Sequence, residues 1–359
     1  MYRVTKQIFN LLIPAILLML TSCDSPKNTS EVKENTGLSK PLQTNDMLLE
    51  GESTAVCYSG FRSGQHPDRG DGAINPTYEE ILEDLFILKD QTPFRLFRLY
   101  DCEENSQMIL EMIREYNLDF KVMLGIWLRA ELSSHETCEW LTEPIPFEKL
   151  EENKLLNQLE IKKGIALANE YADIIVAVNV GNEALVEWND HLISIDSMLS
   201  YVKKVKTAIE QPVTVAENYK WWAEQGKELA ELVDFVAIHS YPIWEGRDIQ
   251  DGLNFTIENV EEVMTALPKS QIVITEAGWA TIATEFGERA SQEKQKKYTQ
   301  DLLEWANYNH ITTFLFEAFD EDWKGNPDNP YGAEKHWGLF TVDREPKLVI
   351  ELFSQVKTE

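Results

Sequence analysis

The chain has 359 residues, of which 43% are hydrophobic and 10% aromatic, so it is long enough to bury a large core. Asp and Glu number 61 against 33 Lys and Arg, which gives a formal net charge of −28. A surface this acidic repels nucleic acid and polyanionic substrates, so the composition favours a neutral or cationic partner. The alternative is that most of the charge only confers solubility.

The N-terminal segment has the order of a secretory signal. Arg3 and Lys6 precede an apolar run over residues 8–20, which is short for a membrane-spanning helix and suited to a signal peptide. The following residues, LTSC, resemble the site at which bacterial lipoproteins are cut before a Cys that then receives lipid. We therefore expect a signal peptide over residues 1–22 and a mature chain that begins at lipidated Cys23. This predicts export to the cell envelope, with a lipid anchor as the contact with the membrane.

Residues 23–50 are polar, contain Pro26 and Pro41, and lack any apolar period, which is typical of a flexible tether. The folded domain is then expected over residues 51–359, as a monomer. Removing Cys23 leaves Cys57, Cys102 and Cys138, an odd number. A disulfide between the last two would be compatible with an oxidising compartment, and the spacing leaves this open.

Strand-like and helix-like segments then alternate along the whole domain. Apolar runs bounded by turn residues predict eight strands, at 54–61, 94–100, 120–128, 174–183, 213–217, 235–241, 272–277 and 313–319. Segments with helical spacing follow each strand, at 77–88, 105–116, 153–171, 196–210, 227–233, 256–266, 292–309 and 348–356. This order predicts the α/β class and a single (β/α)8 TIM barrel. An open doubly wound sheet is disfavoured because the loop after the first strand lacks the G-x-G-x-x-G spacing.

Two predicted strands end in a glutamate. IIVAVNVGNEAL carries Glu183, and QIVITEAGWAT carries Glu276. In a (β/α)8 barrel the active site lies where strands end and the following loops begin, so these two carboxylates should face one another across the barrel mouth. The alternative is that each glutamate pairs with an Arg or caps the following helix.

Nine of the ten tryptophans fall at predicted strand ends or in the segments that follow strands. Indole rings at a barrel mouth would offer flat platforms for the C–H faces of sugar rings, although some are expected to pack the loops instead. Two facing carboxylates among such platforms predict glycoside hydrolysis, with one carboxyl protonating the leaving oxygen and the other acting on the anomeric carbon or on water.

Four further motifs carry a family resemblance. Arg98-Leu99-Tyr100, VGNE (180–183), TEAGW (275–279) and the block 316–347 together resemble glycoside hydrolase family 17, the β-1,3-glucanase family, over residues 54–348. This resemblance implies a retaining barrel glycosidase that cleaves laminarin-type β-glucan. Some bacterial relatives transfer glucosyl units instead, and the same two glutamates would serve both reactions.

The resemblance also implies roles for single residues. Glu183 would be the general acid/base and Glu276 the nucleophile. Asn182 would bond the 2-hydroxyl of the sugar, and Tyr241 would hold Glu276 ionised. Trp279 is expected among the sugar platforms. A further set is implied at the cleft, with a structural role as the alternative for each member: Tyr58, Arg98, Tyr100, Glu321, Lys324 and Glu334.

Neither a cofactor nor a metal ion is expected, because the His, Cys and carboxylate residues lack ligand spacing. His239 is expected to point toward the cleft. A third hypothesis is a glycan-binding lipoprotein that has lost catalysis. Its mark would be a missing glutamate on the fourth or seventh strand, and both glutamates are present.

Overall fold

The computed structural model describes residue 49 and residues 54–68 and 70–354. The chain divides into two units, Met1–Lys40 and Pro41–Glu359, and the described residues all belong to the second. The predicted signal peptide (1–22), Cys23 and nearly all of the tether (23–50) lie outside the described residues. Within the described ranges, each helix is too short or too polar to cross a membrane.

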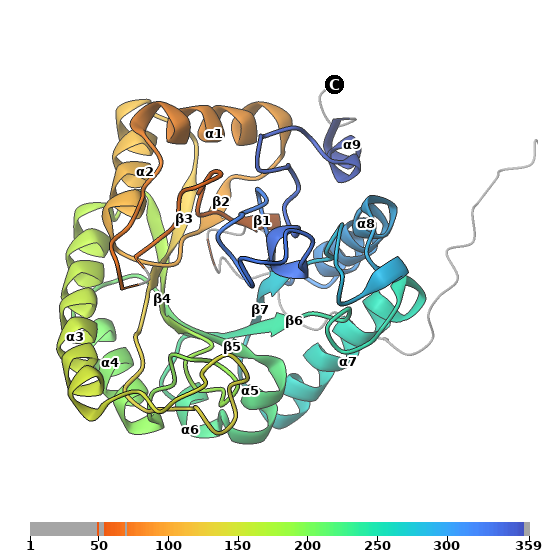
Figure 1. The fold of residues 1–359 in the computed structure, drawn as a ribbon. Helices are drawn as coiled ribbons and strands as arrows, with labels where there is room; N and C mark the ends of the chain where they lie inside the picture. Colours follow the sequence, from red (N-terminus) through yellow and green to blue (C-terminus); the bar gives the residue numbers. More distant parts are fainter. Residues whose placement is uncertain (1–48, 50–53, 69, 355–359) are drawn as a thin grey trace, which may run out of the picture. The chain divides into compact units, whose positions relative to one another are not determined.

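The eight strands are parallel and close into a barrel in chain order, with β8 pairing β1. They are β1 (Thr54–Cys57), β2 (Leu96–Arg98), β3 (Lys121–Ile126), β4 (Ile175–Asn182), β5 (Val213–Asn218), β6 (Val236–Ser240), β7 (Ile272–Ala277) and β8 (Thr313–Leu315). Figure 1 shows the helices arranged around these strands. The predicted (β/α)8 barrel is confirmed.

The helices mostly follow the predicted order. They are α1 (Tyr78–Gln91), α2 (Glu104–Glu115), α3 (Phe147–Glu170), α4 (Ile195–Lys206), α5 (Tyr219–Gln225), α6 (Lys227–Ala230), α7 (Ile249–Ala266), α8 (Gln292–Tyr308) and α9 (Glu351–Ser354). Side-chain caps explain several starts, because Thr77, Ser194 and Ser291 each accept a bond from a backbone N–H of the first turn. Helices α3 and α7 begin six or seven residues earlier than predicted, and α5 was not predicted.

Alternate strand residues face two apolar layers. On β7, Ile272 and Ile274 pack in the layer between strands and helices, whereas Val273 packs among residues of the strands inside the barrel. Two β-strand irregularities interrupt this alternation beside the predicted catalytic residues. One lies on β7 between Ile274 and Ala277, and the other on β4 between Asn179 and Asn182. Such bulges turn the residues that follow them.

The cysteines of the described ranges, Cys57, Cys102 and Cys138, are buried free thiols. The disulfide left open between Cys102 and Cys138 is therefore not formed. Cys102 instead donates from Sγ to the carbonyl of Gly125 at 3.2 Å.

A buried ionic cluster joins the start of the barrel to its C-terminal segment. Asp84 on α1 accepts two bonds from Arg344, at 2.8 and 2.7 Å, and one from Arg62 at 2.9 Å. Arg344 also donates to the carbonyl of Gly60 at 2.8 Å. The Asp84 carboxylate is fully buried, so its negative charge is stabilised only by the guanidinium groups of Arg344 and Arg62 and by its hydrogen bonds.

Replacing Asp84 with Asn should lower the free energy of unfolding by about 3–5 kcal/mol, because two guanidinium groups lose a buried counter-charge. The matched control is Asp173→Asn, which removes an exposed ion pair to Arg114 and should cost less than about 1 kcal/mol. Denaturant unfolding of the purified variants measures both values. Equal losses would contradict the importance of burial.

Candidate active site

Glu183 and Glu276 both lie at the carboxyl ends of their strands, as predicted. Glu183 directly follows β4, and Glu276 is the fifth residue of β7. His239 on β6 lies between them, because its Nδ1 is 2.9 Å from Glu183 Oε1 and 3.4 Å from Glu276 Oε2. The barrel thus brings together two carboxylates that are far apart in the sequence.

The carboxylate of Glu276 is almost enclosed by donors. Arg98 donates to Oε1 at 2.5 Å and Tyr100 donates to the same oxygen at 3.0 Å, while Tyr241 donates to Oε2 at 2.6 Å. Burial alone would raise the pKa of Glu276. The interactions with His239 and Arg98, followed by the two tyrosine hydrogen bonds, outweigh burial and lower that pKa below its ordinary value. Glu276 is therefore held ionised, as a nucleophile requires.

Glu183 lies in a different environment. Its side chain is 21% exposed, against 7% for Glu276. One oxygen faces His239, and the other accepts from Asn189 Nδ2 at 3.2 Å. Its backbone adopts φ +46°, an uncommon value for a residue with a side chain. The more accessible carboxyl is the one placed to exchange a proton with a ligand.

The contacts of His239 indicate where its ring carries a proton. Nδ1 faces oxygens of Glu183 and Glu276, and carboxylates only accept, so Nδ1 donates, while Nε2 lies 3.4 Å from Arg98 Nη1. That proton is directed to the carboxylates of Glu183 and Glu276. Sequence reasoning predicted that His239 points toward the cleft but missed this bridging position, which depends on the register of three strands.

Arg98 and Asn182 contribute differently from the sequence-based expectation. Arg98 is fully buried and donates to Glu276, to Asn182 Oδ1 and to the Thr275 carbonyl. It therefore supports Glu276 and Asn182 from beneath, and its expected place on the sugar-facing wall is wrong. The same contact fixes Asn182 beside Glu183, where Asn182 was expected to bond a sugar hydroxyl.

Two other expected cleft residues are buried elsewhere. Tyr58 is 1% exposed and donates to Asp84 at 3.2 Å, so it belongs to the structural cluster on α1. Trp279 is 0% exposed, donates from its indole N–H to the Arg289 carbonyl at 2.9 Å, and packs against Tyr298. Neither side chain can stack on a sugar. The strand-end position was correct in both cases, but the side chains turn toward the helices.

The remaining polar trio lies together after β8. Lys324 pairs with Glu321 at 2.7 Å, and Glu321 also accepts from Ser59 Oγ at 2.7 Å. Burial raises the pKa of Glu334 to about 7, an effect opposed by Lys324 and reinforced by the charges of Glu183 and Glu276. Glu334 therefore lies close enough to Glu183 and Glu276 to interact electrostatically with both.

Sequence reasoning missed two carboxylates of this region. Glu317 follows β8, is 2% exposed and forms an ion pair with Lys324. Glu217 on β5 is fully buried, accepts from the Leu185 backbone N–H at 2.7 Å and supports the loop after Glu183. Burial raises the pKa of both carboxyls well above the ordinary value. Each is an acidic residue inside an otherwise apolar predicted strand, and this pattern could have identified both from the sequence.

The tryptophans divide as the sequence suggested, between packing and the surface. Trp140, Trp188 and Trp244 are 62%, 46% and 45% exposed. Four others are buried: Trp221, Trp222, Trp279 and Trp337. The exposed indoles lie on loops that follow β3, β4 and β6, at the same end of the barrel as the glutamates.

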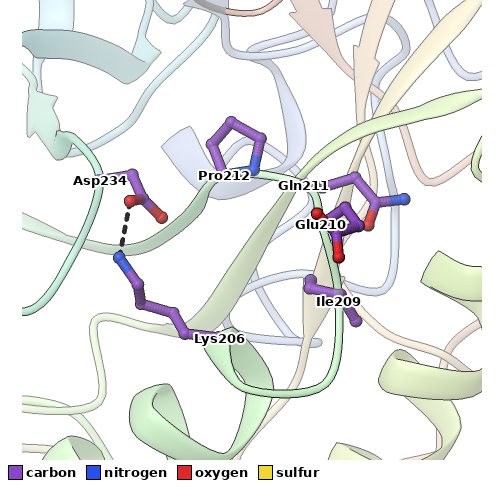
Figure 2. A pocket seen from close by; sticks show the side chains of 6 residues that line it. All are labelled: Lys206, Ile209, Glu210, Gln211, Pro212 and Asp234. Atoms are coloured by element: carbon purple, nitrogen blue, oxygen red, sulfur yellow. Dashed lines mark hydrogen bonds and ion pairs between the residues drawn. The ribbon is translucent and has the colours of Figure 1, made fainter.

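A separate hollow lies at the opposite end of the barrel, where β5 and β6 begin. Figure 2 shows its six lining residues, Lys206, Ile209, Glu210, Gln211, Pro212 and Asp234. Lys206 and Asp234 form an ion pair across it at 2.6 Å, and Asp234 also accepts from the Val213 backbone at 2.8 Å. These contacts stabilise the strand starts. Within the described part of the chain, no cluster of three or more His, Cys, Asp or Glu residues could hold a metal ion.

An ionised carboxylate enclosed by donors, facing a more accessible carboxyl at the mouth of a (β/α)8 barrel, defines a glycosidase-type site. Comparison with known proteins agrees. Residues 55–338 match the BtgE/BtgC glycoside hydrolase domain, and the chain belongs to this family.

The similar proteins cover most of the chain. A glucan 1,3-beta-glucosidase of Schizosaccharomyces pombe is 25% identical over 357 residues, which span 94% of this chain and 96% of that protein. The crystal structure of an endo-laminarinase from Formosa Hel1_33_131 superposes with a TM-score of 0.72 at 26% identity, covering 87% and 89% of the two chains. A glycoside hydrolase family 17 beta-1,3-glucanosyltransferase from Rhizomucor miehei shares the fold, with a TM-score of 0.62, 22% identity and coverage of 83% and 96%. The family resemblance drawn from the motifs is confirmed.

Replacing Tyr241 with Phe should move the acidic limb of the kcat/KM profile to higher pH by about one unit. A hydrogen bond to a charged group contributes about 1.5–3 kcal/mol, and one pKa unit corresponds to about 1.4 kcal/mol. The bond from Tyr241 lowers the pKa of Glu276, so its loss raises that pKa, and activity then disappears earlier as the pH falls. Tyr298→Phe, which removes a buried hydroxyl that contacts Thr256, is the control. An unshifted limb in Tyr241→Phe would contradict the assignment.

Proposed function

We propose that this protein is a retaining glycoside hydrolase that cleaves laminarin-type β-1,3-glucan, with Glu183 as the acid/base and Glu276 as the nucleophile. The observation that carries the proposal is the shared contact with His239 Nδ1. Oε1 of Glu183 and Oε2 of Glu276 both lie within 3.4 Å of this one nitrogen, so the two carboxyl groups approach each other closely. Such an approach favours the separation of about 5–5.5 Å that retaining pairs have over the wider gap of inverting pairs.

The reaction would proceed in two steps. The Glu183 carboxyl donates its proton to the glycosidic oxygen while the bond from that oxygen to the anomeric carbon breaks, and a Glu276 oxygen forms a glycosyl ester with that carbon. Glu183, now a carboxylate, then removes a proton from water. The water oxygen bonds to the anomeric carbon as the ester bond breaks, which regenerates both glutamates and retains the configuration.

The charge distribution suits a neutral sugar polymer. Glu334, with a pKa of about 7, and the pair of Lys324 and Glu321 would supply donors and acceptors for sugar hydroxyl groups at the barrel mouth. The formal net charge of −28 disfavours an anionic polysaccharide. The names of the similar proteins, a glucan 1,3-beta-glucosidase and an endo-laminarinase, support β-1,3-glucan as the substrate.

Glu276→Ala and Glu183→Gln should each lower the hydrolysis of laminarin by at least about 100-fold, because one removes the nucleophile and the other the transferable proton. Proton NMR of the first product formed by the wild-type enzyme should show the β anomer before mutarotation. Glu210→Gln, in the hollow at the opposite end of the barrel, is the control and should retain activity. An initial α anomer would refute retention, and near-normal activity of either glutamate variant would refute its role.

We further propose that the mature protein is an exported monomer anchored to the bacterial envelope through lipid on Cys23. The support is the sequence order of basic residues, apolar run and LTSC at residues 20–23, followed by a polar tether. A tether of this kind would let the barrel reach a large glucan from a membrane surface.

Cys23→Ala should block lipidation, and the expressed protein should then leave the detergent-extractable membrane fraction and appear in the fraction that is released without detergent. Immunoblots of fractionated cells, with metabolic labelling by a fatty-acid analogue, measure both effects. Cys57→Ala, which changes a buried barrel cysteine, is the matched control and should leave labelling unchanged. Membrane retention and labelling of Cys23→Ala would rule out this anchor.

A further inference from the structure

The loop after β4 folds back onto the residue with which it begins. Asn189 Nδ2 donates to the backbone carbonyl of Glu183 at 3.1 Å and to its carboxylate Oε2 at 3.2 Å. A backbone carbonyl can only accept, so the first contact identifies the nitrogen end of the Asn189 amide. One amide group therefore fixes the Glu183 side chain relative to its own backbone, in the left-handed conformation with φ +46°.

His191, two residues further on, fixes the preceding peptide unit. Its Nε2 lies 2.7 Å from the carbonyl oxygen of Asn182, and its Nδ1 lies 3.0 Å from an Asp190 carboxylate oxygen. The imidazole stacks on Trp127 at a centroid distance of 4.7 Å, and the side chain is only 13% exposed. The ring is therefore held on three sides, and its bond to Asn182 is made by a preorganised donor.

The loop itself is anchored independently of these contacts. The segment after β3 bonds to it through Thr137 Oγ1, which donates to the Glu187 carbonyl at 2.5 Å, and through Ser134 Oγ, which donates to the Asn189 carbonyl. The Ile193 backbone N–H closes the loop on the Ala184 carbonyl at 2.8 Å. A loop held in this way can restrain the residues that it contacts.

We propose that Asn189 and His191 are positioning residues for the proton-transfer step, which rests on the proposed role of Glu183. Asn189 holds Oε2 of the Glu183 carboxyl while His239 contacts Oε1, so the carboxyl has one fixed orientation for proton transfer. His191 holds the Asn182–Glu183 peptide on which that side chain is carried. General acid catalysis requires the carboxyl to be within hydrogen-bond reach of the oxygen it protonates, so a freely rotating Glu183 would lose most of its effect.

The test compares two leaving groups. Asn189→Ala should lower kcat/KM for a linear β-1,3-gluco-oligosaccharide by about 10- to 100-fold, because a sugar alkoxide must be protonated as it leaves. The same variant should lower kcat/KM for the 2,4-dinitrophenyl β-glycoside of laminaribiose less than about threefold, because dinitrophenolate leaves without a proton. Asn169→Ala, which removes an exposed amide that bonds two backbone carbonyls on the barrel exterior, is the matched control.

A second pair of variants keeps the inference testable if Asn189→Ala does not fold. His191→Ala should show the same dependence on the leaving group, and His191→Gln, which retains a side-chain N–H donor, should recover part of the loss. His135→Ala, a loop histidine that contacts Ser133, is the control.

Equal losses on both substrates, or no loss on either, in a variant that melts like the wild-type protein would overturn the inference. A wild-type enzyme that cleaves neither substrate would instead refute the proposed function.

Discussion

The buried ion pair between Arg98 and Glu276 is the constraint on which the site depends. Both side chains lie almost out of solvent, so each charge would be strongly destabilised without the other. The same guanidinium holds Asn182 at the end of β4 and faces His239 on β6. One cation therefore sets the relative positions of strands β2, β4, β6 and β7 at the barrel mouth. Glu276 and the residues around Glu183 are positioned by a single planar group.

The barrel mouth contains more carboxylates than cations, and the ionisation of each carboxylate depends on its own partners. Glu276 has Arg98 and two tyrosine hydroxyls and stays ionised. Glu317 shares Lys324 with Glu321, and burial favours its protonated form. Lys324 cannot neutralise every neighbouring carboxylate, so some of these groups hold protons near neutral pH. A site built in this way offers both hydroxyl-like donors and charged acceptors, which is the combination that sugar hydroxyls require.

Most of the fold and the placement of Glu183 and Glu276 could be predicted from the sequence, because both depend on local patterns. Apolar runs identified the strands, two of these runs end in Glu183 and Glu276, and parallel strands bring their ends to one face. Contacts that join distant segments could not be predicted in the same way. Tyr58 pairs with Asp84 and Trp279 turns toward α8, and each orientation depends on partners that no local pattern names. Asn189 and Glu217 were missed for the same reason.

The irregularities in β4 and β7 explain why even the alternation of side chains would mislead. Ile272 and Ile274 pack toward the helices, so strict alternation would turn Glu276 outward as well. In the pairing of β6 with β7, His239 follows Ile238 directly, whereas Glu276 pairs with it after one extra residue, Thr275. This bulge reverses the facing of Glu276 and points it inward, toward Arg98 and Tyr241. A regular β7 would bury the carboxylate against apolar helices, where it has no counter-charge, so the bulge is required by the chemistry of the residue that follows it.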